Sequence, residues 1–149
     1  MTNIACTDMN NSIATVEVCR LKAVKRDVVE ATVKFRLLQK LERFNLHVKL
    51  LRKYNTYEPF IINGTVDVCA FFRNKGKSPL RVLYKLIEKF TNTNHSCPFE
   101  HEIFINRFRP EHENLIINLP TGEYLILFGF YVPKNLLGYL RVWFTFREV

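Results

Sequence analysis

Apolar and polar residues alternate along most of this chain with a period of two, which is typical of β-strands that have one dry face. The pattern is clear in 32–37, where Val33, Phe35 and Leu37 alternate with threonine, lysine and arginine, and again in 44–50. We predict about eight strands. They lie at 16–24, 32–37, 44–50, 60–72 with a break near Asn63, 102–108, 115–119, 124–132 and 139–146.

Segment 124–132 differs from the other strands because its odd-numbered and even-numbered positions are both largely apolar. Such a strand is buried on both sides, or its second face lines something else. Strict alternation returns in 139–146, where Trp143 is the one large apolar residue on the polar face.

One segment departs from the period of two. Ser78 is a good N-cap residue and Pro79 suits the first helical position. The apolar residues that follow recur about every 3.6 residues, which predicts a helix from Pro79 to Thr91. These residues are Leu80, Leu83, Tyr84, Ile87 and Phe90. Strands in series with one inserted α-helix favour a mostly β fold, an antiparallel and immunoglobulin-like β-sandwich, over a parallel α/β sheet.

Length and composition indicate a single domain spanning residues 1–149. The chain has 149 residues, of which 48% are hydrophobic, and nothing in it resembles a linker or a low-complexity tract. Even the apolar run 124–133 falls short of the roughly 18 uncharged residues that span a bilayer. We therefore expect a soluble or peripheral protein.

The net charge of +8 is unevenly distributed. Residues 1–99 hold seventeen Lys and Arg against eight Asp and Glu, whereas residues 100–149 hold five against six. Between Arg20 and Lys53 the cations alternate with apolar residues, as on the solvated face of an amphipathic strand. They include Lys34, Arg36, Lys49 and Arg52. A sharper interpretation is attraction to anionic head groups. No nucleic-acid partner is expected, because zinc-finger spacing, helix-turn-helix patterns and RNP-like aromatic signatures are absent from the sequence.

Four cysteines and three Asn-x-Ser/Thr sequons together point to the secretory pathway. We expect glycans at Asn63 and Asn94, beside a turn signal and just outside the predicted helix, and with less reason at Asn10. The first residues lack the apolar region of a signal peptide, so we interpret the chain as the mature form of an extracellular protein.

The four cysteines allow three disulfide connectivities. We favour Cys6 with Cys19 and Cys69 with Cys97, because each pair encloses a simple out-and-back excursion of the chain. The second bridge would then return both ends of the predicted helix to the sheet.

The sequence contains few of the residue patterns that are typical of catalytic or metal-binding sites. The four histidines, His47, His95, His101 and His112, form no HExxH motif and no i, i+4 pair, so we expect no metal. A thiol nucleophile at Cys97 assisted by His95 is conceivable, but the even number of cysteines favours disulfides. GxSxG, P-loop and GxGxxG motifs are absent from the sequence. We expect no cofactor and no enzymatic activity.

Five distinctive segments occur in order along the chain: LKAVKR at 21–26, YEPF at 57–60, VDVCAFF at 66–72, NTNHSCPF at 92–99 and LPTGEY at 119–124. Asp-x-Cys-x-Phe at 67–71 and Asn-His-Ser-Cys-Pro at 94–98 are the specific motifs. Together they resemble a family of small secreted insect proteins, expanded in flies, of unknown function and similar to the CheB chemosensory proteins. The resemblance covers nearly the whole chain from Cys6 onward. It implies a fold like the ML lipid-recognition superfamily, which includes the ganglioside activator and whose two sheets part to admit acyl chains.

The interior of such a sandwich is either a filled core or a cavity. Thirteen Phe and six Tyr could fill a core to native density. A cavity needs inward faces that leave unfilled volume, and the doubly apolar strand is its best lining. The candidate lining residues are Phe35, Leu37, Leu46, Val48, Ile126, Phe128, Phe130, Val142 and Phe144. Lys49 or Arg141 at the rim could receive an anionic head group, but plain surface charges are the favoured interpretation of both.

We therefore expect a secreted binding protein for a hydrophobic small molecule, such as a lipid, a fatty acid or a cuticular hydrocarbon, used in chemical signalling. The main alternative is an extracellular module without a ligand, which recognises a receptor, another protein or a membrane surface through its basic sheet face. A third alternative, a basic intracellular nucleic-acid binder, would need reduced cysteines and unmodified sequons.

Overall fold

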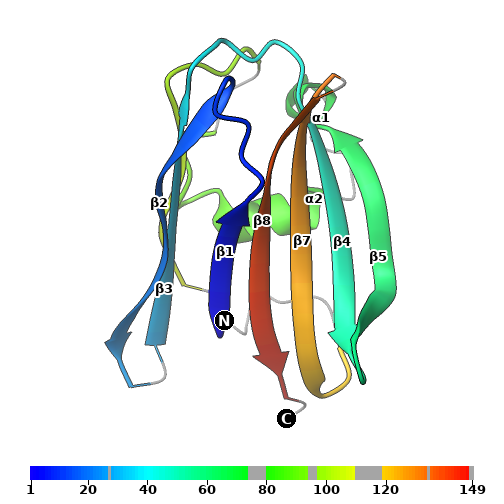
Figure 1. Ribbon diagram of the computed structural model, residues 1–149. Helices are drawn as coiled ribbons and strands as arrows, with labels where there is room; N and C mark the ends of the chain where they lie inside the picture. The colour runs from blue at the N-terminus through cyan, green and yellow to red at the C-terminus, as the bar shows by residue number, and fades with distance from the viewer. Residues whose placement is uncertain (27, 74–79, 94–96, 110–118, 134, 148–149) are drawn as a thin grey trace.

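The computed structural model describes residues 1–26, 28–73, 80–93, 97–109, 119–133 and 135–147. These residues hold eight β-strands and two short α-helices. The strands form two antiparallel sheets that face each other (Figure 1). The predicted antiparallel, mostly β sandwich is therefore confirmed.

The larger sheet has five strands in the order β1-β8-β7-β4-β5. Their bounds are β1 Asn3–Thr7, β4 Asn45–Lys53, β5 Tyr57–Asp67, β7 Gly122–Val132 and β8 Asn135–Phe146. The smaller sheet has three strands in the order β2-β3-β6. Their bounds are β2 Ala14–Lys25, β3 Val28–Leu37 and β6 Glu102–Phe108.

The alternating segments of the sequence correspond to β2, β3, β4, β6, β7 and β8. The alternation does not predict β1, because five residues are too few to show a period of two. Pairing with β8 places β1 at the edge of the larger sheet, where Ile4 lies opposite Val142. The predicted strand 115–119 falls outside the described residues, apart from Leu119.

The predicted strand 60–72 is wrong in its second half. Strand β5 ends at Asp67, and the chain continues as helix α1, Val68–Arg73. The Asp67 carboxylate accepts a hydrogen bond from the backbone N–H of Ala70 at 3.1 Å, as an N-cap residue does. The apolar run that follows suits a buried helix as well as a buried strand, so its pattern alone does not decide between them.

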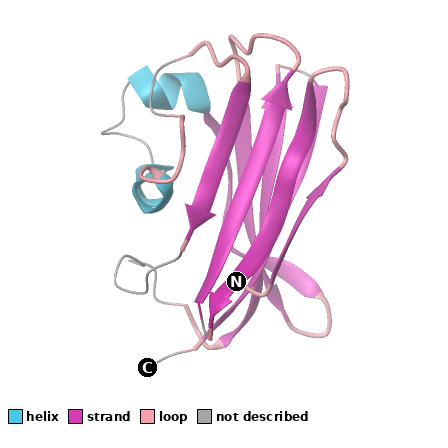
Figure 2. Cartoon of the chain, turned by 90° about the vertical axis from the view of Figure 1, so that its left-hand side faces the viewer, coloured by secondary structure: helices cyan, strands magenta, loops and turns pink. Residues whose placement is uncertain are grey.

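The inserted helix is shorter than predicted. Helix α2 covers Leu80–Ile87, and Ser78 and Pro79 lie outside the described residues. The helix ends before Thr91 because the chain there pairs with β6: Thr91 bridges Ile105, and Asn106 donates to the carbonyl of Phe90 at 2.7 Å. Both helices lie along the same side of the sandwich (Figure 2).

Two apolar clusters join the sheets in the middle and at the upper end of Figure 1. In the middle, Val33 and Phe35 of β3 pack with Ile4 and Leu140 of the larger sheet. The upper cluster comprises Ile13, Ala14, Leu37, Leu41, Phe44, Val68, Cys69, Phe99 and Leu137. Phe44 links the two, because its ring stacks on that of Phe130 at a centroid distance of 5.8 Å.

Both predicted disulfides are confirmed. Cys6 of β1 is bonded to Cys19 of β2, so this bridge joins the two sheets, and the Cα atoms are 6.3 Å apart. Cys69 of α1 is bonded to Cys97, which precedes β6, with a Cα separation of 5.4 Å. The second bridge thus returns the helical excursion to the smaller sheet.

Candidate ligand-binding site

A third apolar cluster lies on the inner face of the larger sheet, at the lower end in Figure 1 where β4 ends and β7 begins. We call it the lower cluster. Leu50, Leu119 and Tyr124 are its buried members, and half-buried apolar residues pack around them. These are Phe60, Ile62, Ile126, Phe144 and Phe146. Among the described residues no side chain of β2, β3 or β6 belongs to this cluster, so the apolar side chains that bury Leu50 and Tyr124 there come from the larger sheet and from Leu119.

The nine predicted lining residues lie on the inner faces of the sheets but fall into two groups. Phe35, Leu37 and Val48 are buried, with exposures of 5%, 7% and 6%. The other six are only half-buried; they are Leu46, Ile126, Phe128, Phe130, Val142 and Phe144. The first group therefore belongs to packed core, while inward-facing side chains of β7 and β8 keep accessible apolar surface.

The smaller sheet loses its cover towards the same end. On its inner face Val33 and Ala31 are each 6% exposed, Val29 is half-buried, and Ala23 is exposed. These residues lie towards the ends of β2 and β3 that diverge from β8 in Figure 1. Among the described residues the inner face of the smaller sheet is thus packed in the middle of the sandwich and more exposed towards its lower end.

The larger sheet is open to solvent at its β5 edge. Gly64 lies opposite Val48 in the β4–β5 ladder and is exposed. A Cβ atom added at Gly64 would meet no described atom within 4 Å, whereas side chains in a packed core touch many neighbours. This edge therefore tolerates additional atoms without repacking.

Arg52 places a positive charge at the edge of the lower cluster. It follows the buried Leu50 by two residues and lies opposite the buried Tyr124 of β7, so its side chain lies on the inner face. The guanidinium carbon is 5.5 Å from the ring centroid of Phe60 and 5.9 Å from that of Tyr124. The guanidinium also lies over Gly122, where a Cβ atom would be 3.3 Å from Nε.

Lys49 and Arg141, the candidate rim residues, lie on the outer face, which agrees with plain surface charges and not with a head-group site at the rim. Lys49 stands between the buried Val48 and Leu50, so the alternation of the strand turns it to the outer face. The ladder puts Lys49 opposite Leu127, and Leu127 opposite Arg141. The two cations therefore share the outer face of the larger sheet. The sequence does contain a signal for Arg52: it lies two residues after the apolar Leu50 and therefore on the same face of the strand.

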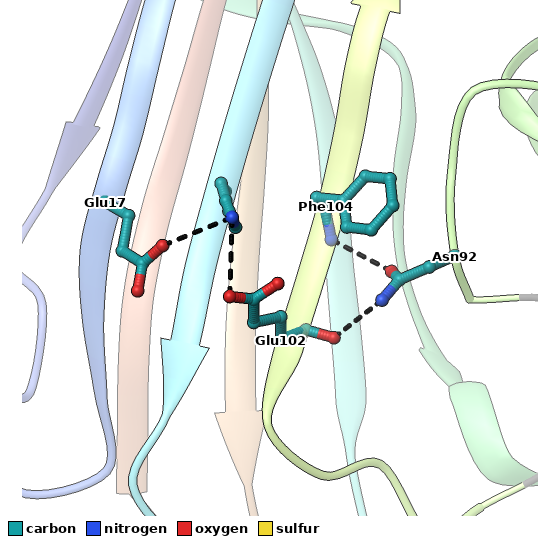
Figure 3. A network of polar contacts seen from close by, with 5 residues as sticks. Glu17, Asn92, Glu102 and Phe104 are labelled. Carbon is teal, nitrogen blue, oxygen red and sulfur yellow. Dashed lines mark hydrogen bonds and ion pairs between the residues drawn. The ribbon is translucent and has the colours of Figure 1, made fainter.

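The cations of the predicted basic face are divided between the sheets. Lys34 and Arg36 lie on the outer face of the smaller sheet, whereas Lys49 lies on that of the larger one. Lys34 is already paired: its Nζ is 3.5 Å from a carboxylate oxygen of Glu17 and 3.3 Å from one of Glu102 (Figure 3). The hydrogen bond to Glu102, with the charge of that carboxylate, raises the pKa of Lys34. Lys34, Arg36 and Lys49 therefore do not share one sheet face.

Asn92 supports the same ion-pair network from the edge of β6. Its side-chain amide donates to the carbonyl of Glu102 at 2.8 Å and accepts from the N–H of Phe104 at 3.0 Å (Figure 3). An amide that both donates and accepts in this way imitates a neighbouring strand and satisfies the backbone of an edge strand. The network therefore stabilises the smaller sheet.

Two tyrosines with shifted pKa values lie away from the lower cluster. The hydrogen bond to Tyr139 raises the pKa of Tyr131, and burial raises that of Tyr84. Among the described residues no group of three or more His, Cys, Asp or Glu is placed to hold a metal ion. Two hollows among the described residues lie away from the lower cluster. One is polar and is lined by Arg36, Glu100, His101 and Glu102. The other is lined by Ile13, Leu41 and Val132, beside the segment between β3 and β4. The lower cluster, by contrast, lies on the inner face of the larger sheet beside the guanidinium of Arg52.

A family model described as "Protein of unknown function (DUF1091)" matches residues 46–126. The match covers more than half of the chain. The chain belongs to this family. The DUF1091 match begins in β4 and ends in β7, so it contains Arg52, most of the lower cluster and the Cys69–Cys97 disulfide. None of the curated proteins compared with the chain matches it.

The two disulfides fit an extracellular protein. Neither helix in the described part of the chain has the length and apolar character that crossing a bilayer requires.

Proposed function

We propose that the protein is a secreted binding protein for a hydrophobic small molecule or lipid, which it holds between its sheets against the lower cluster. The observation that supports this proposal most is that the inward-facing apolar side chains Ile126 and Phe144 stay half-buried, in a cluster to which the described part of the smaller sheet contributes no side chain. An apolar ligand at this end would remove that surface from water, which is favourable by about 25 cal/mol per Å².

The sequence resemblance supports the same proposal. The segments shared with the secreted insect proteins similar to CheB chemosensory proteins favour export and a role in chemical signalling. An ML-like sandwich, with sheets that part around acyl chains, agrees with an inner face whose apolar side chains Ile126 and Phe144 stay half-buried. Three sequons and two disulfides add support for secretion and glycosylation.

Two adjacent residues offer a matched test. Ile126 faces inward with the lower cluster, whereas Leu127 faces outward opposite Lys49. The protein, secreted from insect cells, should carry lipid in native mass spectrometry. Ile126→Trp should fill part of the site and lower the amount of bound lipid, while Leu127→Trp should leave it unchanged.

The stability of Ile126→Trp distinguishes a ligand site from a filled core. Extra atoms in a packed interior cost about 1–3 kcal/mol, whereas an unfilled site accepts them with little loss. Urea unfolding should therefore show Ile126→Trp to be nearly as stable as the parent. A parent without lipid, together with a strongly destabilised Ile126→Trp, would contradict the proposal.

One observation favours the second candidate, an extracellular interaction module. Leu51, Leu125 and Trp143 form a half-buried apolar row across the outer face of the larger sheet, next to Lys49 and Arg141. Such a row beside cations suits an acidic protein surface. Charge reversal at Lys49 and Arg141 should abolish partner binding under this alternative and leave lipid content unchanged.

A further inference from the structure

The contacts that hold Arg52 in the fold use only part of the hydrogen-bonding capacity of its guanidinium. Its guanidinium is held by aromatic rings, with its carbon 5.3 Å from the ring centroid of Tyr54, and Nη2 donates to the carbonyl of Thr121 at 3.2 Å. A guanidinium has five N–H donors, so most of its hydrogen-bonding capacity is not used by this contact. The ring faces fix the side chain and leave donors at its edge available.

Neighbouring carboxylates do not neutralise this charge. Among the described residues Arg52 makes no ion pair within 4.0 Å. Glu58 lies opposite Arg52 in the β4–β5 ladder, but its side chain is exposed and forms no ion pair with Arg52. Glu123 is paired with Lys53 at 3.4 Å instead. As far as the described residues show, the guanidinium therefore stands half-buried at the end of an apolar surface without a paired carboxylate.

We propose that Arg52 binds the anionic head group of the ligand, so that the protein selects single-chain amphiphiles with a carboxylate, of the long-chain fatty acid class. The inference rests on the proposed function, since it names the ligand that the lower cluster takes. The acyl chain would lie along Ile126 and Phe144, and the carboxylate would accept from the guanidinium above Gly122. Arginine suits this role because its planar fork matches a carboxylate, and charge-assisted hydrogen bonds are the stronger ones.

The test compares two probes of equal chain length, palmitic acid and hexadecanol, in titration calorimetry. Hydrogen bonds to charged groups contribute about 1.5–3 kcal/mol, which corresponds to roughly a 10-fold to 100-fold difference in affinity. The wild-type protein should bind palmitate at least about 10-fold more tightly than hexadecanol. Arg52→Gln should remove this preference by weakening palmitate alone, and Arg52→Lys should restore part of it. Lys49→Gln, a cation on the outer face of the same strand, should change neither affinity.

Gly122→Ala gives a second variant that keeps the charge. The added Cβ would lie 3.3 Å from Nε of Arg52, so the guanidinium must move away from its present position. Palmitate affinity should fall severalfold and hexadecanol affinity should stay unchanged, with circular dichroism confirming that the variant is folded.

Two outcomes would overturn the inference in distinguishable ways. Equal wild-type affinities for palmitate and hexadecanol, or an equal loss of both in Arg52→Gln, would refute the role of Arg52 while leaving the binding site intact. Absence of binding for both probes would refute the proposed function and, with it, the role of Arg52.

Discussion

Removal of the disulfide that joins the two sheets should cost a predictable part of the stability. Cys6 and Cys19 are 13 residues apart, and replacement of both by alanine releases that loop in the unfolded chain. The chain-entropy relation gives a loss of about 2.9 kcal/mol at 25 °C for such a loop. The same relation gives about 3.6 kcal/mol for the 28-residue separation of Cys69 and Cys97.

Urea unfolding of the two double variants, compared with the parent, measures both losses. Replacing each pair together avoids an unpaired thiol, and the slope of the unfolding curve checks that the denatured state is comparable. We expect each variant to lose roughly 3 kcal/mol, with the larger loss for the Cys69–Cys97 pair. A loss below about 1 kcal/mol for Cys6→Ala/Cys19→Ala would refute the reasoning, because the bridge would then constrain little of the unfolded chain.

Two further predictions concern Asn63 and Lys34. Secreted protein should carry a glycan on Asn63. Its exposed side chain accepts a hydrogen bond through Oδ1 from His47 at 2.6 Å, which leaves the amide nitrogen for the sugar. Thr65→Ala should remove the mass of the glycan without unfolding the protein, and an unmodified Asn63 in the parent would contradict this prediction. The raised pKa of Lys34 means that its stabilising charge is fully present below the ordinary lysine value of 10.5 and is lost as the pH rises through the folded value. Above pH 10.5 the free energy of unfolding should therefore fall more steeply in the parent than in Lys34→Gln. Parallel curves of unfolding free energy against pH would refute the stabilising role of the Lys34 charge.

The sequence predicts those parts of the fold that have a local pattern. The period of two identifies β3, β4 and β8 because one face of each strand is buried and the other is solvated. It fails at 68–72, since an uninterrupted apolar run satisfies a helix and a strand equally, and only the N-cap Asp67 distinguishes them. The disulfides follow from the simple order of the excursions that they close.

The candidate site depends on information that no local pattern contains. The sequence identifies Ile126 and Phe144 as inward-facing, but their partial exposure depends on which side chains pack against them, which is a property of the packed molecule. The alternation of the strand could have predicted that Arg52 and not Lys49 faces inward, because Arg52 lies two residues after the apolar Leu50. The approach of Arg52 to Gly122 could not be predicted in this way, since those residues are brought together by pairing of β4 and β7.

Photolabelling with a diazirine-bearing palmitic acid tests the central claim most directly. After irradiation of the purified protein, peptide fragmentation identifies the residues that carry the label. We predict labels on inner-face residues of the lower cluster, chiefly Ile126, Phe144 and Phe60, which excess unlabelled palmitate prevents. Labels confined to the outer-face residues Leu125, Leu127 and Trp143, or labelling that palmitate does not compete, would contradict a ligand site between the sheets.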